Sequence, residues 1–248
     1  MLLKGGKTLG AAFGMAALTG MAAPSVLSQL TSNDYGFIAR AERDAGDELT
    51  YNSPQETCTL TGALTLGPCY AANAALVRRD ITTATPGLPM RLGFRIIRAS
   101  DCQPVTNATV DVWHVHALGI YSALTAPVCT TGANVVNETW CRGVQPTDSN
   151  GIAYFDSIYP GWYSGRTTHI HLTVRIGGNI SVTTQFAFAE RVNDFIYRKH
   201  PMYNTRPGTR TTNNSNDNIF NPANIATFSF NTRYKNNQLH AFKTIAIA

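Results

Sequence analysis

Charged residues are scarce in this chain: Asp, Glu, Lys and Arg together make up 14% of its 248 residues. Lys and Arg outnumber Asp and Glu by 20 to 15, a formal net charge of +5, but they are scattered singly and in pairs. The sequence therefore lacks the basic stripe that a nucleic-acid-binding surface needs. The hydrophobic fraction of 44% excludes an intrinsically disordered chain and is enough to build a sizeable core.

Long apolar runs are also lacking outside the N-terminus, so we expect no membrane span, which would need about 20 such residues. At the N-terminus itself, Lys4 and Lys7 precede a short apolar stretch, which small residues and Pro24 follow. A basic start, a short apolar centre and small residues before a proline are the parts of a secretory signal. We therefore expect residues 1–23 to be a signal peptide, cleaved near Ala22 or Ala23, and the protein to be secreted.

The remainder divides into two expected parts. Residues 24–57 are interpreted as an N-terminal extension and linker, with a short helix over residues 34–49. Residues 58–248 are expected to form one domain. Removing the signal, with its two lysines, leaves a net charge of +3, from 18 basic and 15 acidic residues.

Cysteine is limited to five residues, and none has the Cys-x-x-Cys spacing of a zinc knuckle. Five cysteines in a chain of this kind fit an oxidising compartment, and the odd number leaves at least one thiol unpaired. Cys129 and Cys141 bracket a polar loop and are the expected disulfide. Cys58 with Cys102 is a weaker candidate pair.

Amphipathic helical patterns are nearly absent after residue 58, and short apolar–polar alternations take their place. Turn residues separate these runs, for example Asp148-Ser-Asn-Gly151 and Gly177-Gly178-Asn179. Segment 190–237, rich in Asn, Thr and Arg, is expected to form surface loops. The pattern predicts an all-β protein, an antiparallel β-sandwich with long surface loops. The expected strands cover residues 90–98, 109–113, 152–155, 168–176, 182–188 and 239–247.

The strand over residues 168–176 carries the first candidate site. Because strand side chains alternate, His169 and His171 project from one face, about 6–7 Å apart along the strand, and can reach one metal ion. Tyr163 lies six residues before His169 in a Pro-Gly-Trp-Tyr turn. A second tyrosine, Tyr121, follows the strand over residues 109–113.

A His-x-His pair is weak as a metal signal on its own. The chain contains another, His114 and His116, and isolated tyrosines usually serve packing. The signal is stronger in residues 163–171, where a tyrosine, an arginine and two histidines occur within nine positions.

Further short motifs surround this string in a fixed order. They are Gly67-Pro68-x-Tyr70, Pro86-Gly-Leu-Pro89, Val110-Asp-Val-Trp-His114, Gly119-Ile-Tyr-Ser122, Arg142-Gly-Val-Gln145, Thr147-Asp-x-x-Gly151, Tyr159-Pro-Gly-Trp-Tyr163, Gly165-Arg166, His169-Ile-His171 and Thr184-Gln185-Phe186. With these motifs the chain resembles, from about Cys58 to Phe188, the intradiol ring-cleavage dioxygenases and especially their secreted, single-domain branch.

The resemblance implies a non-haem Fe(III) held by two tyrosinates and two histidines, which correspond here to Tyr121, Tyr163, His169 and His171. Phenolate oxygen is a hard, anionic donor that suits ferric iron, and imidazole suits the remaining positions. The implied reaction cleaves a catechol-type ring between its two hydroxylated carbons. Both atoms of O2 enter the product, a muconate-type diacid.

Three residues receive catalytic roles from the same resemblance. The resemblance implies that Tyr163 leaves the metal when substrate binds and takes up a substrate proton. Arg166 stabilises negative charge that builds on the ring carbon, and Gln185 lines the same site.

Two departures from the family pattern stand out. Cys69 replaces a tyrosine at the mouth of the site, which puts substrate contacts there in doubt. Val115-His116 replaces Cys-Asp, so Cys102 could lack its usual partner.

Two other functions remain open from the sequence. One is a non-catalytic secreted binding module of the same fold. The other is a secreted Zn or Cu hydrolase using His169 and His171, although residues 159–171 contain no carboxylate for it. The identity of the ortho-dihydroxy aromatic substrate and the oligomeric state are not indicated.

Overall fold

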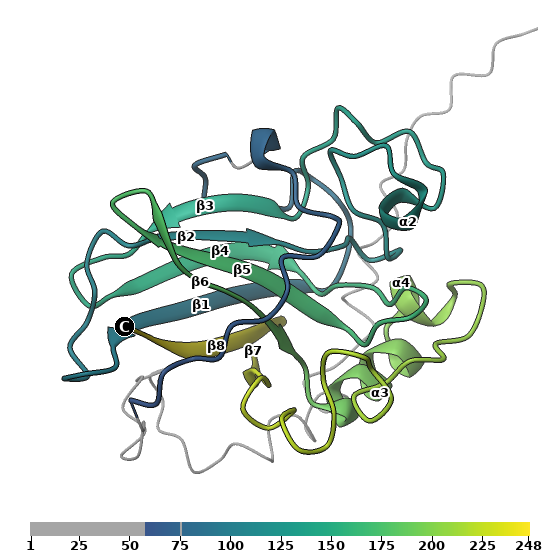
Figure 1. Ribbon diagram of the computed structural model, residues 1–248. Coiled ribbons are helices and arrows are strands. Elements are labelled where there is room, and N and C mark those ends of the chain that lie inside the picture. Colours follow the sequence, from purple (N-terminus) through teal and green to yellow (C-terminus); the bar gives the residue numbers. More distant parts are fainter. Residues whose placement is uncertain (1–57, 75) are drawn as a thin grey trace, which may run out of the picture.

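The computed structural model describes residues 58–248 except residue 75 (Figure 1). The expected signal peptide, the extension and the helix over residues 34–49 lie outside the described residues. The described part contains the strands β1 (Pro89–Arg98), β2 (Thr109–Trp113), β3 (Arg142–Pro146), β4 (Ile152–Ile158), β5 (His169–Ile176), β6 (Asn179–Ala187), β7 (Asn231–Lys235) and β8 (Gln238–Ile247). Its helices are the 3-10 turn Ala72–Ala74, α2 (Pro127–Thr130), α3 (Glu190–Lys199) and α4 (Pro201–Asn204).

The strands form two four-stranded sheets, one ordered β4-β1-β8-β7 and the other β3-β2-β5-β6. This confirms the all-β sandwich. All described strand pairs are antiparallel except β1 and β8, which run parallel from Met90 opposite Leu239 to Arg98 opposite Ile247. The last strand therefore makes the first sheet mixed.

The hydrophobic core lies between the two sheets. Strand β5 is an example of a strand whose alternate side chains pack into this core. Ile170, Leu172 and Val174 are at most 1% exposed and pack into this core. The alternate residues His169 and His171 project from the opposite, outer face of the sheet. Figure 1 shows the dark blue segment before β1 running across the molecule in front of β5 and β6. Its backbone contacts β6, since Leu64 N–H donates to Thr183 C=O at 2.9 Å.

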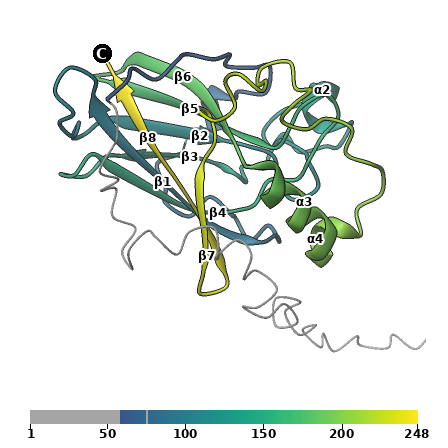
Figure 2. The ribbon, with the colours of Figure 1, turned by 90° about the horizontal axis from the view of Figure 1, so that it is seen from below.

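The expectation that segment 190–237 consists only of loops is wrong, because α3, α4 and β7 fall within it. In α3, Val192 and Ile196 lie one turn apart and are buried, which is the amphipathic spacing of a short helix. The strand β7 is joined to β8 by Asn236 and Asn237, both with positive φ, as a tight hairpin requires. Figures 1 and 2 show α2, α3 and α4 at the same end of the sandwich.

One expected disulfide is confirmed and one is wrong. Cys58 is bonded to Cys102, which therefore has a partner despite the altered motif at residues 115–116. Cys129 is bonded to Cys69 and not to Cys141, which is a free, buried thiol. The reason is that Cys141 packs into the core between the sheets, whereas Cys69 and Cys129 belong to a separate apolar cluster with Tyr121.

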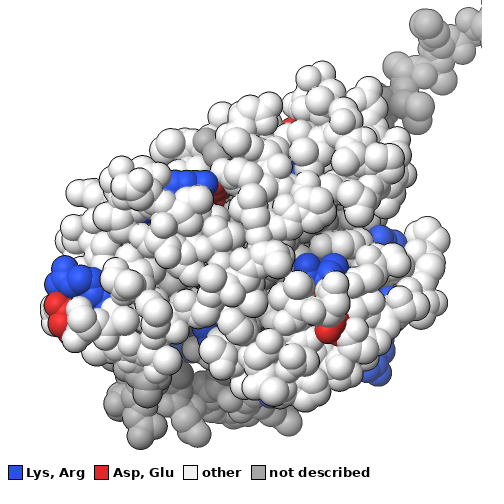
Figure 3. Space-filling model, viewed as in Figure 1, with Lys and Arg blue, Asp and Glu red and all other residues white. Residues whose placement is uncertain are grey.

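Lys and Arg side chains lie as separate small groups on the face shown in Figure 3. That face therefore carries no basic stripe. Within residues 58–248, apart from residue 75, no helix has the length and hydropathy needed to cross a membrane.

Candidate metal centre

The two histidines of β5 meet on the outer face of their sheet. Their ring centroids are 4.8 Å apart, and the two Nε2 atoms lie 3.0 Å from each other. Trp113 of β2 stands opposite His171 in the strand register and stacks on its ring at 5.0 Å, with an interplanar angle of 13°. The sheet thus fixes both imidazoles through strand alternation and one stacked indole.

A tight turn brings the first tyrosine to the same point. Tyr163 and Arg166 face each other across a turn in which Gly165 has a φ of 85°. A positive φ of this size favours glycine. The turn points the Tyr163 side chain back toward β5, where its Oη lies 3.2 Å from His169 Nε2.

The second tyrosine reaches the cluster from the loop after β2. Tyr121 is 2% exposed, and its backbone N–H donates to Cys129 C=O at 2.9 Å. Its ring centroid lies 5.8 Å from that of Tyr163 and 6.2 Å from that of His171, both edge to face. The four side chains expected as metal ligands are therefore brought together by three separate segments.

The hydrogen bonds of His169 indicate which of its nitrogens is free to bind a metal. His169 Nδ1 lies 2.6 Å from Thr167 C=O, which can only accept, so the ring proton is assigned to Nδ1. His169 Nε2 then carries the lone pair, as in metal-ligating histidines held by a backbone carbonyl. His171 Nδ1 is buried without a hydrogen-bond partner among the described residues.

Burial controls the protonation of these groups. It lowers the pKa of His169 and His171 well below their ordinary value, and the nearby Arg166 guanidinium lowers both further. Burial also raises the pKa of Tyr121 and Tyr163, against the opposing effect of Arg166. The imidazoles are therefore neutral, which is the form that can coordinate a metal ion. The phenols keep their protons until a cation binds.

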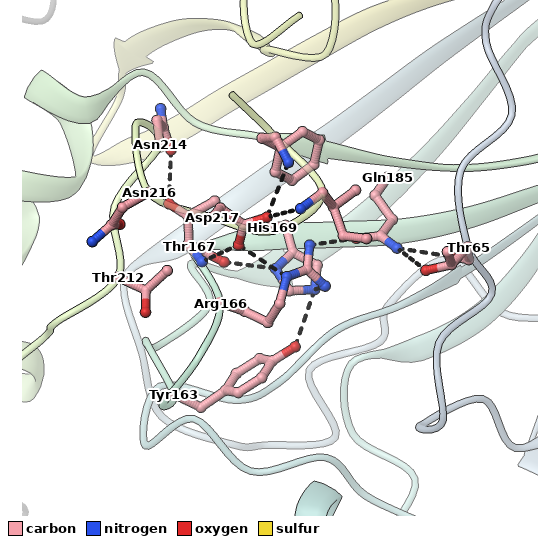
Figure 4. Close-up of polar contacts among 12 residues, drawn as sticks. Thr65, Tyr163, Arg166, Thr167, His169, Gln185, Thr212, Asn214, Asn216 and Asp217 are labelled. Carbon is pink, nitrogen blue, oxygen red and sulfur yellow. Dashed lines mark hydrogen bonds and ion pairs between the residues drawn. The ribbon is translucent and has the colours of Figure 1, made fainter. Parts of the chain in front are cut away.

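Arg166 and Gln185 complete the cluster (Figure 4). Arg166 Nη1 is 3.4 Å from His169 Nε2, and Arg166 Nη2 donates to Gln185 Oε1 at 2.8 Å. Gln185 is fully buried opposite His171 in the β5–β6 register, and its Nε2 donates to Thr65 C=O at 2.7 Å. With a side chain only 14% exposed, Arg166 is part of the site and not a surface cation.

The other histidine pair has a structural role. His114 is fully buried, with Nδ1 2.7 Å from Val115 C=O and Nε2 2.8 Å from Ser157 Oγ. His116 stacks on Trp140 at 4.9 Å. In the described part of the chain, no group of three or more His, Cys, Asp or Glu is placed to hold a metal ion, so no carboxylate- or thiolate-based site accompanies either pair.

Several residues of this site were not predicted from the sequence. Trp113 belongs to the motif of residues 110–114 but received no role from it, and Thr65 and Thr167 belong to none of the motifs. Asp217, whose carboxylate contacts Arg166, lies in the segment expected to be loops. The sequence did contain one indication that Asp217 is important, because it is the single acidic residue after Asp194.

Comparisons with known proteins agree with this architecture. Residues 65–235, more than half of the chain, match the family model Dioxygenase_C, described as "Dioxygenase". No curated protein sequence matches the chain significantly.

Several solved structures are similar. An intradiol ring-cleavage dioxygenase from Tetranychus urticae is 27% identical with a TM-score of 0.67, over 77% of this chain and 94% of its own. The dioxygenase domain of a carbohydrate-binding fusion protein from Streptomyces sp. SirexAA-E is 24% identical with a TM-score of 0.53, over 75% and 97%. A 3-chlorocatechol 1,2-dioxygenase from Rhodococcus opacus 1CP is 16% identical with a TM-score of 0.53, over 75% and 71%, which shows the shared fold.

The sequence motifs, the sandwich and the family match lead to the same assignment. The chain belongs to the intradiol ring-cleavage dioxygenases, a family whose members cleave catechol-type aromatic rings.

Proposed function

We propose that this protein is a non-haem Fe(III)-dependent dioxygenase that cleaves a catechol-type ring between its two hydroxylated carbons. Both atoms of O2 would enter a muconate-type diacid. One observation carries the proposal: Tyr163 Oη and His171 Nε2 lie 3.2 and 3.0 Å from His169 Nε2, with Tyr121 packed beside them.

The donor set fits ferric iron. Two phenol oxygens and two imidazole nitrogens offer hard and intermediate donors, and the phenols become anionic on binding a cation. Gly67 leaves room for the site, because a Cβ at this position would lie 3.1 Å from His171 Cε1. Tyr121, Tyr163, His169 and His171 would hold the ion. Bound there, ferric iron would draw electron density from a chelated catechol and make the ring carbon reactive toward O2.

The residues of this chain would contribute orientation, charge and proton transfer. Tyr163 Oη, once deprotonated, is the acceptor for a proton from a substrate hydroxyl. The Nη1 group of Arg166 faces the same space and would stabilise negative charge on the ring. Gln185 holds the guanidinium, because its Oε1 accepts from Arg166 while its Nε2 is fixed by Thr65.

Labelled oxygen tests this proposal. The iron-loaded protein is incubated with catechol, hydroxyquinol and protocatechuate under isotopically labelled O2, and products are identified by mass spectrometry. We expect at least one ring-opened diacid that carries both labelled oxygen atoms, and none from the His171→Ala variant. Absence of any ring-opened product, with iron bound, would favour the non-catalytic binding module. A product with a single labelled atom would contradict dioxygenation.

We also propose that residues 1–23 direct secretion. The two disulfides of the folded domain support this, because such bonds persist in oxidising compartments. N-terminal sequencing of protein recovered from the culture medium should find a start near residue 23 or 24. Retention inside the cell with an intact N-terminus would contradict it.

A further inference from the structure

A buried carboxylate stands directly behind the arginine of the candidate metal centre. The Asp217 side chain is fully buried, and both of its oxygens are used. Its Oδ1 accepts from the backbone N–H groups of Ile219 and Phe220, at 2.8 and 3.0 Å. Its Oδ2 accepts from Arg166 Nε at 2.9 Å and from the Thr167 N–H at 2.7 Å. One oxygen therefore orders the local loop, and the other faces the site.

These contacts leave the guanidinium a single orientation. Arg166 Nε is held by Asp217, and Arg166 Nη2 is held by Gln185. Phe220 lies against the guanidinium, with its ring centroid 5.8 Å from Arg166 Cζ. Because the guanidinium is planar and rigid, fixing Nε and Nη2 also fixes Nη1. Figure 4 shows Arg166 between Asp217 on one side and Gln185 on the other.

The same carboxylate supports His169, one of the proposed metal ligands, through a single residue, Thr167. Thr167 donates its N–H to Asp217 and presents its C=O to His169 Nδ1. Asn214, from the same loop, accepts from Thr167 Oγ1 at 2.7 Å. The loop around Asp217 thus braces the chain between Arg166 and His169.

We infer that Asp217 is a positioning residue for ring cleavage: it holds the Arg166 guanidinium so that Nη1 faces the reacting ring. This inference rests on the proposed function. A buried cation also needs a counter-charge, and Asp217 is the carboxylate that the structure places against it. A displacement of about 1 Å in a positioned group can cost about a hundredfold in rate.

Asparagine is the informative substitution at this position. An amide has one acceptor oxygen, so Asp217→Asn cannot serve the loop N–H groups and the Arg166 and Thr167 N–H groups together. We expect the iron-loaded variant to keep its iron and its visible absorption. Its kcat should fall by about tenfold to a hundredfold, with KM changed much less. The matched control is Asp156→Asn, because Asp156 also pairs with arginines, Arg79 and Arg91, but on the other sheet.

A double-mutant cycle separates positioning from a general structural effect. In an Arg166→Ala background, Asp217→Asn should lower kcat by a much smaller factor than in the wild-type background, because the guanidinium is already gone and only the contacts of Asp217 with backbone N–H groups remain to be lost. An equal fall in both backgrounds, or an unchanged kcat in the single variant, would overturn the inference. If Asp217→Asn does not fold, Asp217→Glu takes its place in the cycle. Failure of both to fold would overturn the inference too, since Asp217 would then serve folding.

Crystal structures of the wild type and Asp217→Asn give a readout that does not depend on turnover. The inference expects a rotated or disordered Arg166 guanidinium in an otherwise superposable protein. An unmoved guanidinium would contradict it. A wild type that converts no catechol would refute the proposed function, and these structures would still decide what Asp217 holds in place.

Discussion

At the residue scale, two guanidinium groups flank the phenols of the candidate metal centre. Arg166 pairs with Tyr163 across their shared turn and lies 3.4 Å from His169 Nε2. Arg142 is 2% exposed, lies 5.7 Å above the Tyr121 ring, and donates to Ser122 C=O and Cys69 C=O. Burial lowers the pKa of Arg142 to about 10, and the nearby Tyr121 opposes this shift. The positive charges of Arg166 and Arg142 favour the phenolate form of the nearby tyrosines, whereas burial favours their protonated form.

The role of Arg166 can be tested by its removal. Arg166→Ala should leave the four donor side chains and the bound iron in place. Turnover should fall by about 10²–10³, because a preorganised donor to developing negative charge is lost. The measurement is kcat per bound iron, with Arg91→Ala as the control, because Arg91 also pairs with a carboxylate, that of Asp156, but on the other sheet. A kcat within a few-fold of the wild type would show that Arg166 does not act on the substrate.

Several residues of this site could be predicted from the sequence, because the information is local. The alternation of β5 placed His169 and His171 on one face, and the turn motif placed Tyr163 near them. Asp217 could not be predicted in this way, since its contact with Arg166 spans 51 residues and depends on how a long loop folds back.

At the scale of elements, the helices and the disulfide that were not predicted also lack a clear local signal in the sequence. A short helix such as α3 contains only a few repeats of the amphipathic pattern. It also lies in segment 190–237, whose Asn-rich composition is typical of loops. Disulfide pairing likewise depends on which apolar cluster each cysteine joins in the fold, which spacing along the chain does not reveal. By contrast, the Gly177-Gly178 hairpin between β5 and β6 was predicted, because two residues with positive φ are a local signal.

The Cys69–Cys129 disulfide joins the segment before β1 to α2, beside the backbone of Tyr121. Replacing both cysteines by alanine should lower the free energy of unfolding by about 2–4 kcal/mol, because the bond closes a long loop. It should also weaken iron retention, because the Tyr121 loop loses its tether. Urea unfolding and iron content after dialysis against a chelator measure the two effects.

The second disulfide provides the control. Cys102 lies four residues after β1, and Figure 1 shows that β1 ends on the side of the sandwich opposite α2. Replacing Cys58 and Cys102 by alanine should cost a similar amount of stability. Iron retention should stay at the wild-type level. Equal iron loss from both double variants would show that the Cys69–Cys129 bond has no particular connection to the site.

At the scale of the whole molecule, buried neutral histidines make stability depend on pH. Burial lowers the pKa of His114 to about 4, below its ordinary value of 6.5. The unfolded chain therefore binds more protons between these values, and stability falls as the pH drops from about 6.5 toward 4.

Between pH 7 and pH 5, His114 alone should account for a loss of about 2 kcal/mol in the free energy of unfolding. Urea unfolding at the two pH values measures this loss in the wild type and in His114→Gln. The variant should show a smaller difference between the two pH values, whatever its stability at pH 7. An unchanged difference would mean that His114 is not held neutral by burial.

The central claim is that Tyr121 and Tyr163 join His169 and His171 in binding ferric iron, and the visible absorption spectrum of the iron-loaded protein tests it most directly. We expect a broad phenolate-to-iron charge-transfer band. Tyr121→Phe and Tyr163→Phe should each shift and weaken that band, whereas the control Tyr154→Phe, on the other sheet, should leave it unchanged. An iron-loaded wild type without a visible band, or a band that neither ligand substitution alters, would contradict tyrosinate ligation and with it the proposed dioxygenase activity.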